Sequence, residues 1–281
     1  MIPTLFDYQR ATSIDDAVAK LQAAAGGKLI AGGHSLVPLM KLRLSEPSVL
    51  IDVARIPGLS GIREKAGRIE IGAATTHRDV AASALLRQVC PVVADTAIEI
   101  GDPQVRNRGT LGGSLAHADP AADYPATMLA VDAEIHLKGA KGWRKVNASQ
   151  FFQGMFTVDL APDEIIANVQ FTPIKAAAYA KLHQRASHFA IVGVAAAVEV
   201  KDGVFQSVRL GLTGATTHAV RLTGVEQALT GKPATREAVA SAAAAATVDE
   251  VNSDIHASEE YRRAMIKVFT RRALEGALAR A

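Results

Sequence analysis

Cysteine is almost absent from this sequence, with a single residue, Cys90, among 281. One thiol cannot form an internal disulfide, a zinc site built from cysteines or an iron–sulfur site of four thiolates. This scarcity excludes a disulfide-framed protein and favours a reducing compartment. Cys90 precedes a proline within an apolar segment, and we expect it to be a buried, unreactive thiol.

Long hydrophobic runs and blocks of one charge are also missing. The longest apolar stretch, residues 189–198, is far shorter than the roughly 20 residues that cross a bilayer, and the first residues lack the regions of a signal peptide. The net charge is +3, with acids and bases mixed along the chain, unlike the clustered bases of nucleic-acid-binding proteins. We therefore expect a soluble, cytoplasmic, globular protein.

Side chains for hydrolytic or metal chemistry do not form a recognisable constellation. There is no Gly-x-Ser-x-Gly elbow and no convincing pair of nucleophile and base. The scattered histidines lack metal-ligand spacing, and we expect solvated or capping roles for them; they are His77, His117, His183, His188 and His218.

The first fifty residues predict a small α/β unit. Ser13 can cap a helix that Gly26-Gly27 ends. A short strand over residues 29–31 runs into a glycine turn and a helix over 36–44, and a further strand follows at 49–53.

The remaining sequence predicts helices and strands whose pattern changes near residue 175. Up to about residue 175, strands are expected at 68–73, 133–137 and 164–171 and helices at 85–100 and 124–131, whereas 101–122 lacks a period and predicts a long irregular segment. Beyond it, Asp202-Gly203 predicts a hairpin, followed by helices at 225–229, 236–246 and 259–280. We place a domain boundary between 175 and 176, with subdomains of about 1–55 and 56–175 before it. Glu259-Glu260 and Arg262-Arg263 predict a charged helix face.

Two similar glycine loops are the main chemical signal. They are Ala31-Gly32-Gly33-His34-Ser35 and Gly109-Thr110-Leu111-Gly112-Gly113-Ser114. Glycines let the backbone approach an anion, successive amides form a concave nest, and the hydroxyl adds a donor. Two such loops can grip a pyrophosphate from two sides. The alternative is a pair of ordinary strand-to-helix turns. Neither loop matches the Rossmann fingerprint or a P-loop.

These loops and several other motifs, in this order, give the chain its resemblance to a known family. The chain resembles the FAD-binding medium subunit of molybdenum hydroxylases, of the carbon monoxide dehydrogenase and xanthine dehydrogenase type. The matching segments are Ile2-Pro3, Phe6-Asp7-Tyr8, Ala31–Leu36, Asp102–Arg106, Gly109–Gly113, Asp119-Pro120, Asp123, Tyr261-Arg262 and Arg271–Ala273. Ser114 stands where relatives often have Asn, but a serine can still donate a hydrogen bond.

The resemblance implies an α+β chain: a two-subdomain FAD-binding fold of the vanillyl-alcohol-oxidase (PCMH) type, then a C-terminal α/β domain with an antiparallel sheet covered by helices. FAD would bind noncovalently between the subdomains, with its diphosphate on the two loops. The implied FAD-binding residues are Lys28, Leu29, Ala31, Gly32, Gly33, His34, Ser35, Leu36, Thr110, Leu111, Gly112, Gly113, Ser114, Ala116, Asp123, Ile165, Ile166, Lys181 and Phe189. No catalytic residue and no metal ligand are implied on this chain.

Three polar side chains at the loops have alternative interpretations. His34 can be a flavin contact or a structural residue. Arg106 and Arg108 can bind phosphate, pair with Asp102, or face a partner subunit.

The resemblance also implies a role within a larger assembly. Electrons would pass from [2Fe–2S] clusters on an iron–sulfur small subunit to FAD on this chain, and then to quinone, NAD or oxygen. The molybdenum cofactor would lie on a large subunit that chooses the substrate. The assembly would be a dimer of heterotrimers, cytoplasmic or attached through the complex to the inner membrane face. A stand-alone flavin oxidoreductase and a non-enzymatic assembly protein are the alternatives.

Overall fold

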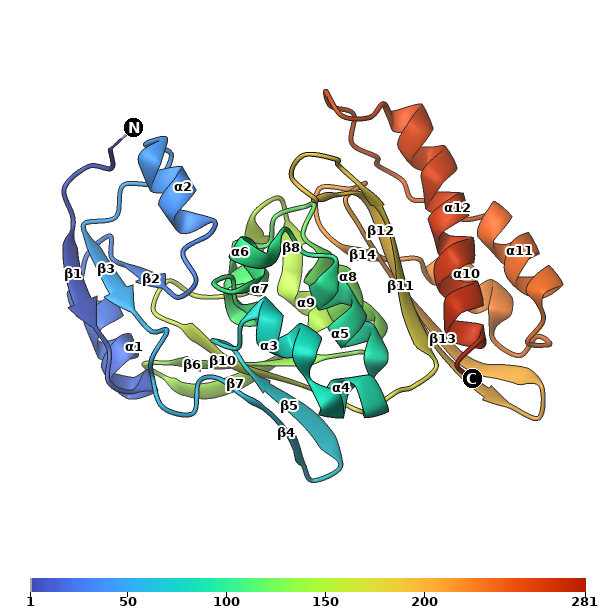
Figure 1. The fold of residues 1–281 in the computed structure, drawn as a ribbon, viewed down its shortest axis with the longest axis horizontal. Helices are drawn as coiled ribbons and strands as arrows, with labels where there is room; N and C mark the ends of the chain where they lie inside the picture. Colours follow the sequence, from blue (N-terminus) through green and yellow to red (C-terminus); the bar gives the residue numbers. More distant parts are fainter. Residues whose placement is uncertain (1) are drawn as a thin grey trace.

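The computed structural model describes residues 2–281, which form three sheets of three to five strands, a small hairpin and their covering helices (Figure 1). The N-terminal subdomain is a parallel sheet in the order β1-β3-β2, with two helices. Its elements are β1 (Asp7–Arg10), α1 (Ile14–Ala23), β2 (Lys28–Ile30), α2 (Leu36–Lys41) and β3 (Val49–Asp52). Ser13 caps α1 through the amide of Asp16, so the predicted α/β unit is confirmed.

The second subdomain is built on a five-stranded antiparallel sheet in the order β4-β5-β10-β6-β7. Fully buried Tyr124, Phe151 and Phe171 belong to its core. The strands are β4 (Ile62–Lys65), β5 (Arg68–Gly72), β6 (Glu134–Gly139), β7 (Gly142–Asn147) and β10 (Ile165–Phe171), with a small hairpin of β8 (Phe152–Gly154) and β9 (Thr157–Val158). The helices are α3 (His77–Ala82), α4 (Ala84–Val89), α5 (Pro91–Ile98), α6 (Pro103–Arg106), α7 (Leu111–His117), α8 (Asp123–Ala130) and α9 (Ala148–Phe151).

The C-terminal part is an antiparallel sheet in the order β11-β12-β13-β14. Helix α12 packs on β11 and β12, whereas α8 of the second subdomain packs on β12 and β13. Figure 1 shows the sheet standing between these two helices. The elements are β11 (Ala177–His183), β12 (Ala190–Lys201), β13 (Val204–Thr213), β14 (Val220–Arg221), α10 (Thr223–Leu229), α11 (Arg236–Ala244) and α12 (Glu259–Leu278). The mixed helix-and-sheet architecture that we expected is confirmed.

The expected irregular segment at 101–122 is wrong, because it contains α6 and α7. Asp102 caps α6 by accepting a hydrogen bond from the Val105 amide at 2.8 Å. Thr110 caps α7 by accepting from the Gly113 amide at 3.1 Å. Helices this short show no hydrophobic period, so their capping residues were the only local signal.

The expected charged face at the start of α12 is also wrong in part, because Arg262 is buried. Its guanidinium donates to the carbonyl oxygens of Ile191 and Gly214 and to the Asp254 carboxylate. Across residues 2–281, none of the helices combines the length and the apolar composition needed to cross a lipid bilayer.

Candidate functional site

The two glycine loops touch each other at the junction of the first two subdomains. A Cβ atom at Gly32 would lie 2.8 Å from both the carbonyl carbon of Arg108 and the Cα atom of Gly109, and closer still to the Arg108 oxygen. The next residue, Gly33, has φ +74°, a backbone conformation that favours glycine. The first loop therefore needs glycine at both positions. Gly32 allows the close approach of the Arg108 backbone, and Gly33 allows the positive φ.

The first loop presents unused hydrogen-bond donors. The backbone N–H groups of residues 32–36 donate no hydrogen bond to any other part of residues 2–281. His34 and Ser35 are exposed, and the Ser35 hydroxyl does not cap α2. Consecutive free amides beside a helix N-terminus are suited to an anion.

The second loop lacks the amide nest that its glycines suggest. The Leu111 amide donates to the carbonyl of Thr75 at 3.0 Å, and the Gly112 amide donates to the carbonyl of Ala73 at 2.8 Å. A Cβ atom at Gly112 would clash with Ala73, whereas Gly113 and Ala116 are exposed and Ser114 is half-buried. The Leu111 and Gly112 amides of this loop are therefore already hydrogen-bonded within the protein, and only the exposed edge of α7 at Gly113 and Ala116 is free.

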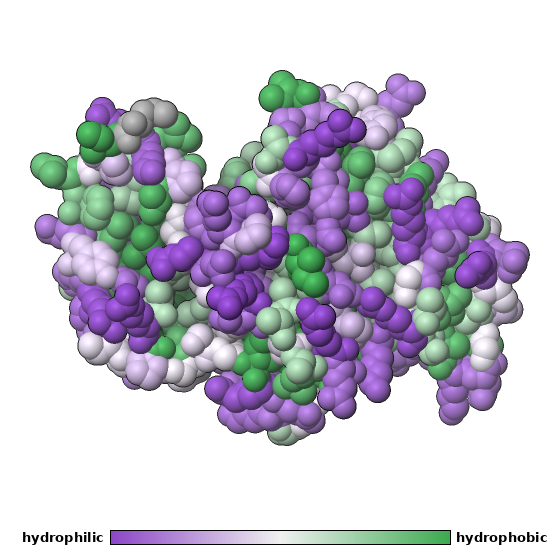
Figure 2. All heavy atoms as spheres, in the orientation of Figure 1, coloured by the Kyte–Doolittle hydropathy of each residue, from purple (hydrophilic) through white to green (hydrophobic). Residues whose placement is uncertain are grey.

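A hollow separates the N-terminal subdomain from the rest of the molecule, as the space-filling view shows (Figure 2). Burial lowers the pKa of His117 at the end of α7; the Lys28 charge on β2 acts in the same direction and Asp119 acts against it. Ile165 and Ile166 at the start of β10 are buried in the core. The other predicted residues around the first loop, Leu29 on β2, Ala31 and Leu36 on α2, are half-buried.

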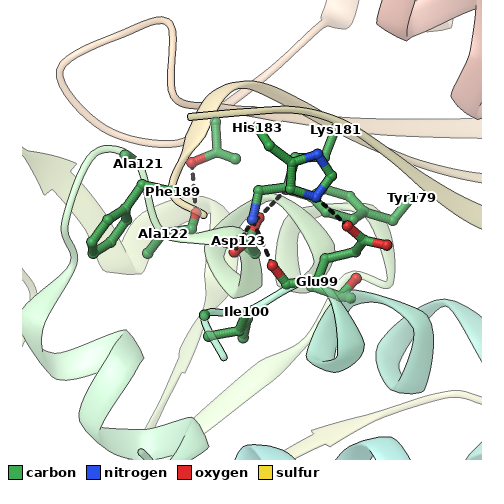
Figure 3. Close-up of polar contacts among 12 residues, drawn as sticks. Glu99, Ile100, Ala121, Ala122, Asp123, Tyr179, Lys181, His183 and Phe189 are labelled. Atoms are coloured by element: carbon green, nitrogen blue, oxygen red, sulfur yellow. Dashed lines mark hydrogen bonds and ion pairs between the residues drawn. The ribbon is translucent and has the colours of Figure 1, made fainter. Parts of the chain in front are cut away.

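A second polar cluster joins the second subdomain to the C-terminal sheet (Figure 3). The Lys181 ammonium lies 2.8 Å from the Asp123 carboxylate, and it also donates to the carbonyl of Glu99 at 2.8 Å. The Tyr179 hydroxyl donates to the same carboxylate. Burial raises the pKa of Asp123, while Lys181 and Tyr179 act in the opposite direction. Asp123 and Lys181, both predicted site residues, are therefore brought together as a buried ion pair.

The sequence did not predict a second group of polar side chains, more exposed than the Asp123–Lys181 pair and next to it. His183 contacts the Glu99 carboxylate at 2.5 Å, and the rings of His183 and His188 meet edge to face. Together with Asp102 and Arg106 they line a shallow pocket of about 260 Å³. No spacing signal connects these residues, because they come from the end of α5, the two ends of α6, the end of β11 and the loop after β11. Phe189 follows on that loop and is 46% exposed.

The phosphate interpretation of Arg106 is not supported. Its guanidinium donates to the carbonyl oxygens of Ile98, Ile100 and Gly101 at 2.8–3.2 Å, so that it caps the end of α5. Arg108 is exposed and meets the first loop through its backbone. Within residues 2–281, no group of three or more His, Cys, Asp or Glu side chains is arranged to hold a metal ion.

This fold and this junction define a flavoprotein with an FAD-binding domain and a C-terminal domain. The family described as "FAD binding domain in molybdopterin dehydrogenase" matches residues 4–173. The family described as "CO dehydrogenase flavoprotein C-terminal domain" matches residues 177–277. The chain belongs to the FAD-binding medium-subunit family of molybdenum hydroxylases, and the resemblance inferred from the sequence is confirmed.

Relatives from the same family match this chain over its full length. It is 40% identical to the carbon monoxide dehydrogenase medium chain of Hydrogenophaga pseudoflava, over 100% of this chain and 99% of that one. It is 37% identical to the 6-hydroxypseudooxynicotine dehydrogenase complex subunit alpha of Paenarthrobacter nicotinovorans, over 100% and 97%. The structure matches carbon monoxide dehydrogenase from Hydrogenophaga pseudoflava, solved without the Mo-pyranopterin moiety, with a TM-score of 0.94 at 39% identity over the whole of both chains.

Proposed function

We propose that this chain is the electron-transfer subunit of a molybdenum-containing dehydrogenase, holding the FAD through which electrons leave the enzyme. The observation that carries this proposal is the contact of Gly32 with the Arg108 backbone, beside five amides without partners. Such a group of donors suits the diphosphate of a dinucleotide. FAD supplies the redox chemistry, because a flavin exchanges one or two electrons, and the protein supplies position and electrostatics.

The residues of the junction and of the buried ion pair would hold the cofactor from two ends. The first loop would bind the diphosphate through its amides, with Ser114 and the exposed edge of α7 opposite. The Asp123–Lys181 pair would fix the environment of the ring system. We retain as FAD-binding residues Lys28, Leu29, Ala31–Leu36, Thr110–Ser114, Ala116, Asp123, Ile165, Ile166, Lys181 and Phe189. We also propose a domain boundary between residues 175 and 176.

The chemistry of substrate oxidation would lie on other chains. The two named relatives carry the names of complexes that act on carbon monoxide and on 6-hydroxypseudooxynicotine, yet this chain is similar to both along its whole length. One thiol cannot ligate iron–sulfur clusters. We therefore propose an iron–sulfur small subunit with [2Fe–2S] clusters and a large subunit with the molybdenum cofactor, in a cytoplasmic dimer of heterotrimers. Quinone, NAD and oxygen are the candidate external acceptors.

Cofactor analysis of two preparations tests this proposal. The chain is purified alone and after co-expression with the products of neighbouring genes, and the small molecules released by denaturation are identified by mass spectrometry. We expect FAD together with co-purifying iron–sulfur and molybdenum chains in the second preparation. FAD without partners would favour a stand-alone flavoenzyme, and no flavin in either preparation would refute the proposal.

A further inference from the structure

Tyr179 is a further member of the buried cluster around the Asp123–Lys181 ion pair, although no sequence motif includes it. Its hydroxyl donates to Oδ1 of Asp123, whose two carboxylate oxygens lie 2.8 and 2.9 Å from the Lys181 ammonium (Figure 3). Tyr179 and Lys181 are two residues apart on β11, so their side chains leave the same face of the sheet. One strand therefore holds the carboxylate through two side chains.

A glycine on the neighbouring strand makes room for the tyrosine. Gly193 on β12 pairs with Lys181 in the register of β11 and β12. A Cβ atom at Gly193 would lie 2.2 Å from the Tyr179 hydroxyl oxygen and 3.0 Å from Cζ of its ring. The phenol therefore lies against the backbone of Gly193, where it reaches Asp123 on α8. A larger residue at position 193 would displace the hydroxyl.

The hydroxyl is one of few partners that the carboxylate has. Within residues 2–281, the Asp123 carboxylate is bonded to Lys181 and Tyr179 only, whereas Lys181 also donates to the carbonyl of Glu99 at 2.8 Å. Burial and the Asp123 charge raise the pKa of Tyr179 well above its ordinary value, so the hydroxyl remains protonated and is a donor. Without it, the carboxylate would depend on Lys181 alone.

We propose that Tyr179 is a positioning residue for the cofactor, which holds the Asp123 carboxylate and thereby sets how strongly the Lys181 charge acts on the ring system. This inference rests on the proposed function, because it takes Asp123 and Lys181 to be the residues beside that ring system. A flavin that takes up two electrons and one proton gains a negative charge, so a positive neighbour favours its reduced form. The hydroxyl compensates part of the Asp123 charge and leaves the ammonium less neutralised.

Loss of the hydroxyl should therefore make FAD harder to reduce. In Tyr179→Phe the phenyl ring fills the same space, but the carboxylate keeps more of its negative charge. At a fixed electrode potential, the ratio of reduced to oxidised FAD should fall roughly tenfold, which is a shift of about 30 mV to more negative potential for a two-electron couple. A role in packing alone would weaken the binding of both forms equally and leave the potential unchanged.

Redox titration of the co-purified complex, followed by the absorbance of the flavin, tests the inference. The wild type is compared with Tyr179→Phe and with Gly193→Ala, which keeps the hydroxyl but displaces it. Tyr124→Phe is the matched control, because Tyr124 is a fully buried tyrosine next to Asp123 whose hydroxyl has no partner within residues 2–281. Circular dichroism verifies that each protein is folded, and the FAD released by denaturation is quantified.

We expect Tyr179→Phe and Gly193→Ala to be reduced at a more negative potential than the wild type, and Tyr124→Phe to match the wild type. An unchanged or more positive potential in Tyr179→Phe, or an equal shift in Tyr124→Phe, would overturn the inference and leave the proposed function intact. If Tyr179→Phe does not fold, Gly193→Ala decides in the same way. Absence of FAD from every protein, the wild type included, would instead overturn the proposed function.

Discussion

The Lys181 ammonium and the Asp123 carboxylate form an ion pair that is closed to solvent, with side chains only 1% and 4% exposed. Each partner comes from a different part of the molecule, Asp123 from the first turn of α8 and Lys181 from β11. Isolated charges are very unfavourable in such an environment, so each of these residues depends on the other. The pair therefore ties the FAD-binding domain to the C-terminal sheet.

Removal of one member of this pair should destabilise the protein more than removal of the charge from both. Lys181→Met leaves the Asp123 carboxylate buried without a counter-ion and should cost about 3–5 kcal/mol of unfolding free energy. Lys181→Met combined with Asp123→Asn should cost clearly less. Urea unfolding of the three proteins measures both values, and a double variant no more stable than Lys181→Met would contradict this account.

An added methyl group at Gly32 should prevent the two loops from closing. Gly32→Ala places Cβ against the Arg108 backbone, which cannot move away without separating the loops. We expect at least a ~100-fold loss of FAD affinity, or about 3 kcal/mol. Gly224→Ala is the control, because a Cβ atom there meets open space on α10. Flavin fluorescence titration measures the affinity, and wild-type binding by Gly32→Ala would refute the site.

The guanidinium of Arg262 should not be replaceable by an ammonium. It reaches two carbonyl oxygens and a carboxylate at once, at 2.5–2.7 Å, and lysine cannot reproduce this fork. Arg262→Lys should cost about 2 kcal/mol or more. Arg271→Lys, at an exposed position on the same helix paired with Glu275, should cost less than about 0.5 kcal/mol. Equal effects in thermal unfolding would show that the buried contacts are not the stabilising ones.

The single thiol should be inert in the folded protein. Cys90 is fully buried, and burial raises the pKa of its thiol to about 12. At pH 8 a thiol reagent should therefore react with none of the native chain and with one group per chain in denaturant. Rapid reaction without denaturant would mean that the region around α4 and α5 opens.

The sequence alone determined several features whose cause is local. Ser13 caps its helix, Asp202-Gly203 forms a hairpin turn, and the glycine motifs carry the resemblance to the flavoprotein family. The predicted contact residues stay predictions. Short α6 and α7 were missed, because fewer than two turns give no period to detect.

Only the tertiary structure decided which of the polar groups in these motifs remain free. The two glycine loops have similar sequences, yet the Leu111 and Gly112 amides of the second donate to the turn between β5 and α3, whereas the amides of residues 32–36 have no partner within residues 2–281. Arg106 was drawn to the end of α5, Arg262 was buried, and His77 was placed behind Gly109. Arg262 and His77 owe their positions to contacts between segments about 30 to 70 residues apart, and Arg106 owes its position to carbonyls 5 to 8 residues away that the turn after α5 presents; local propensities encode neither.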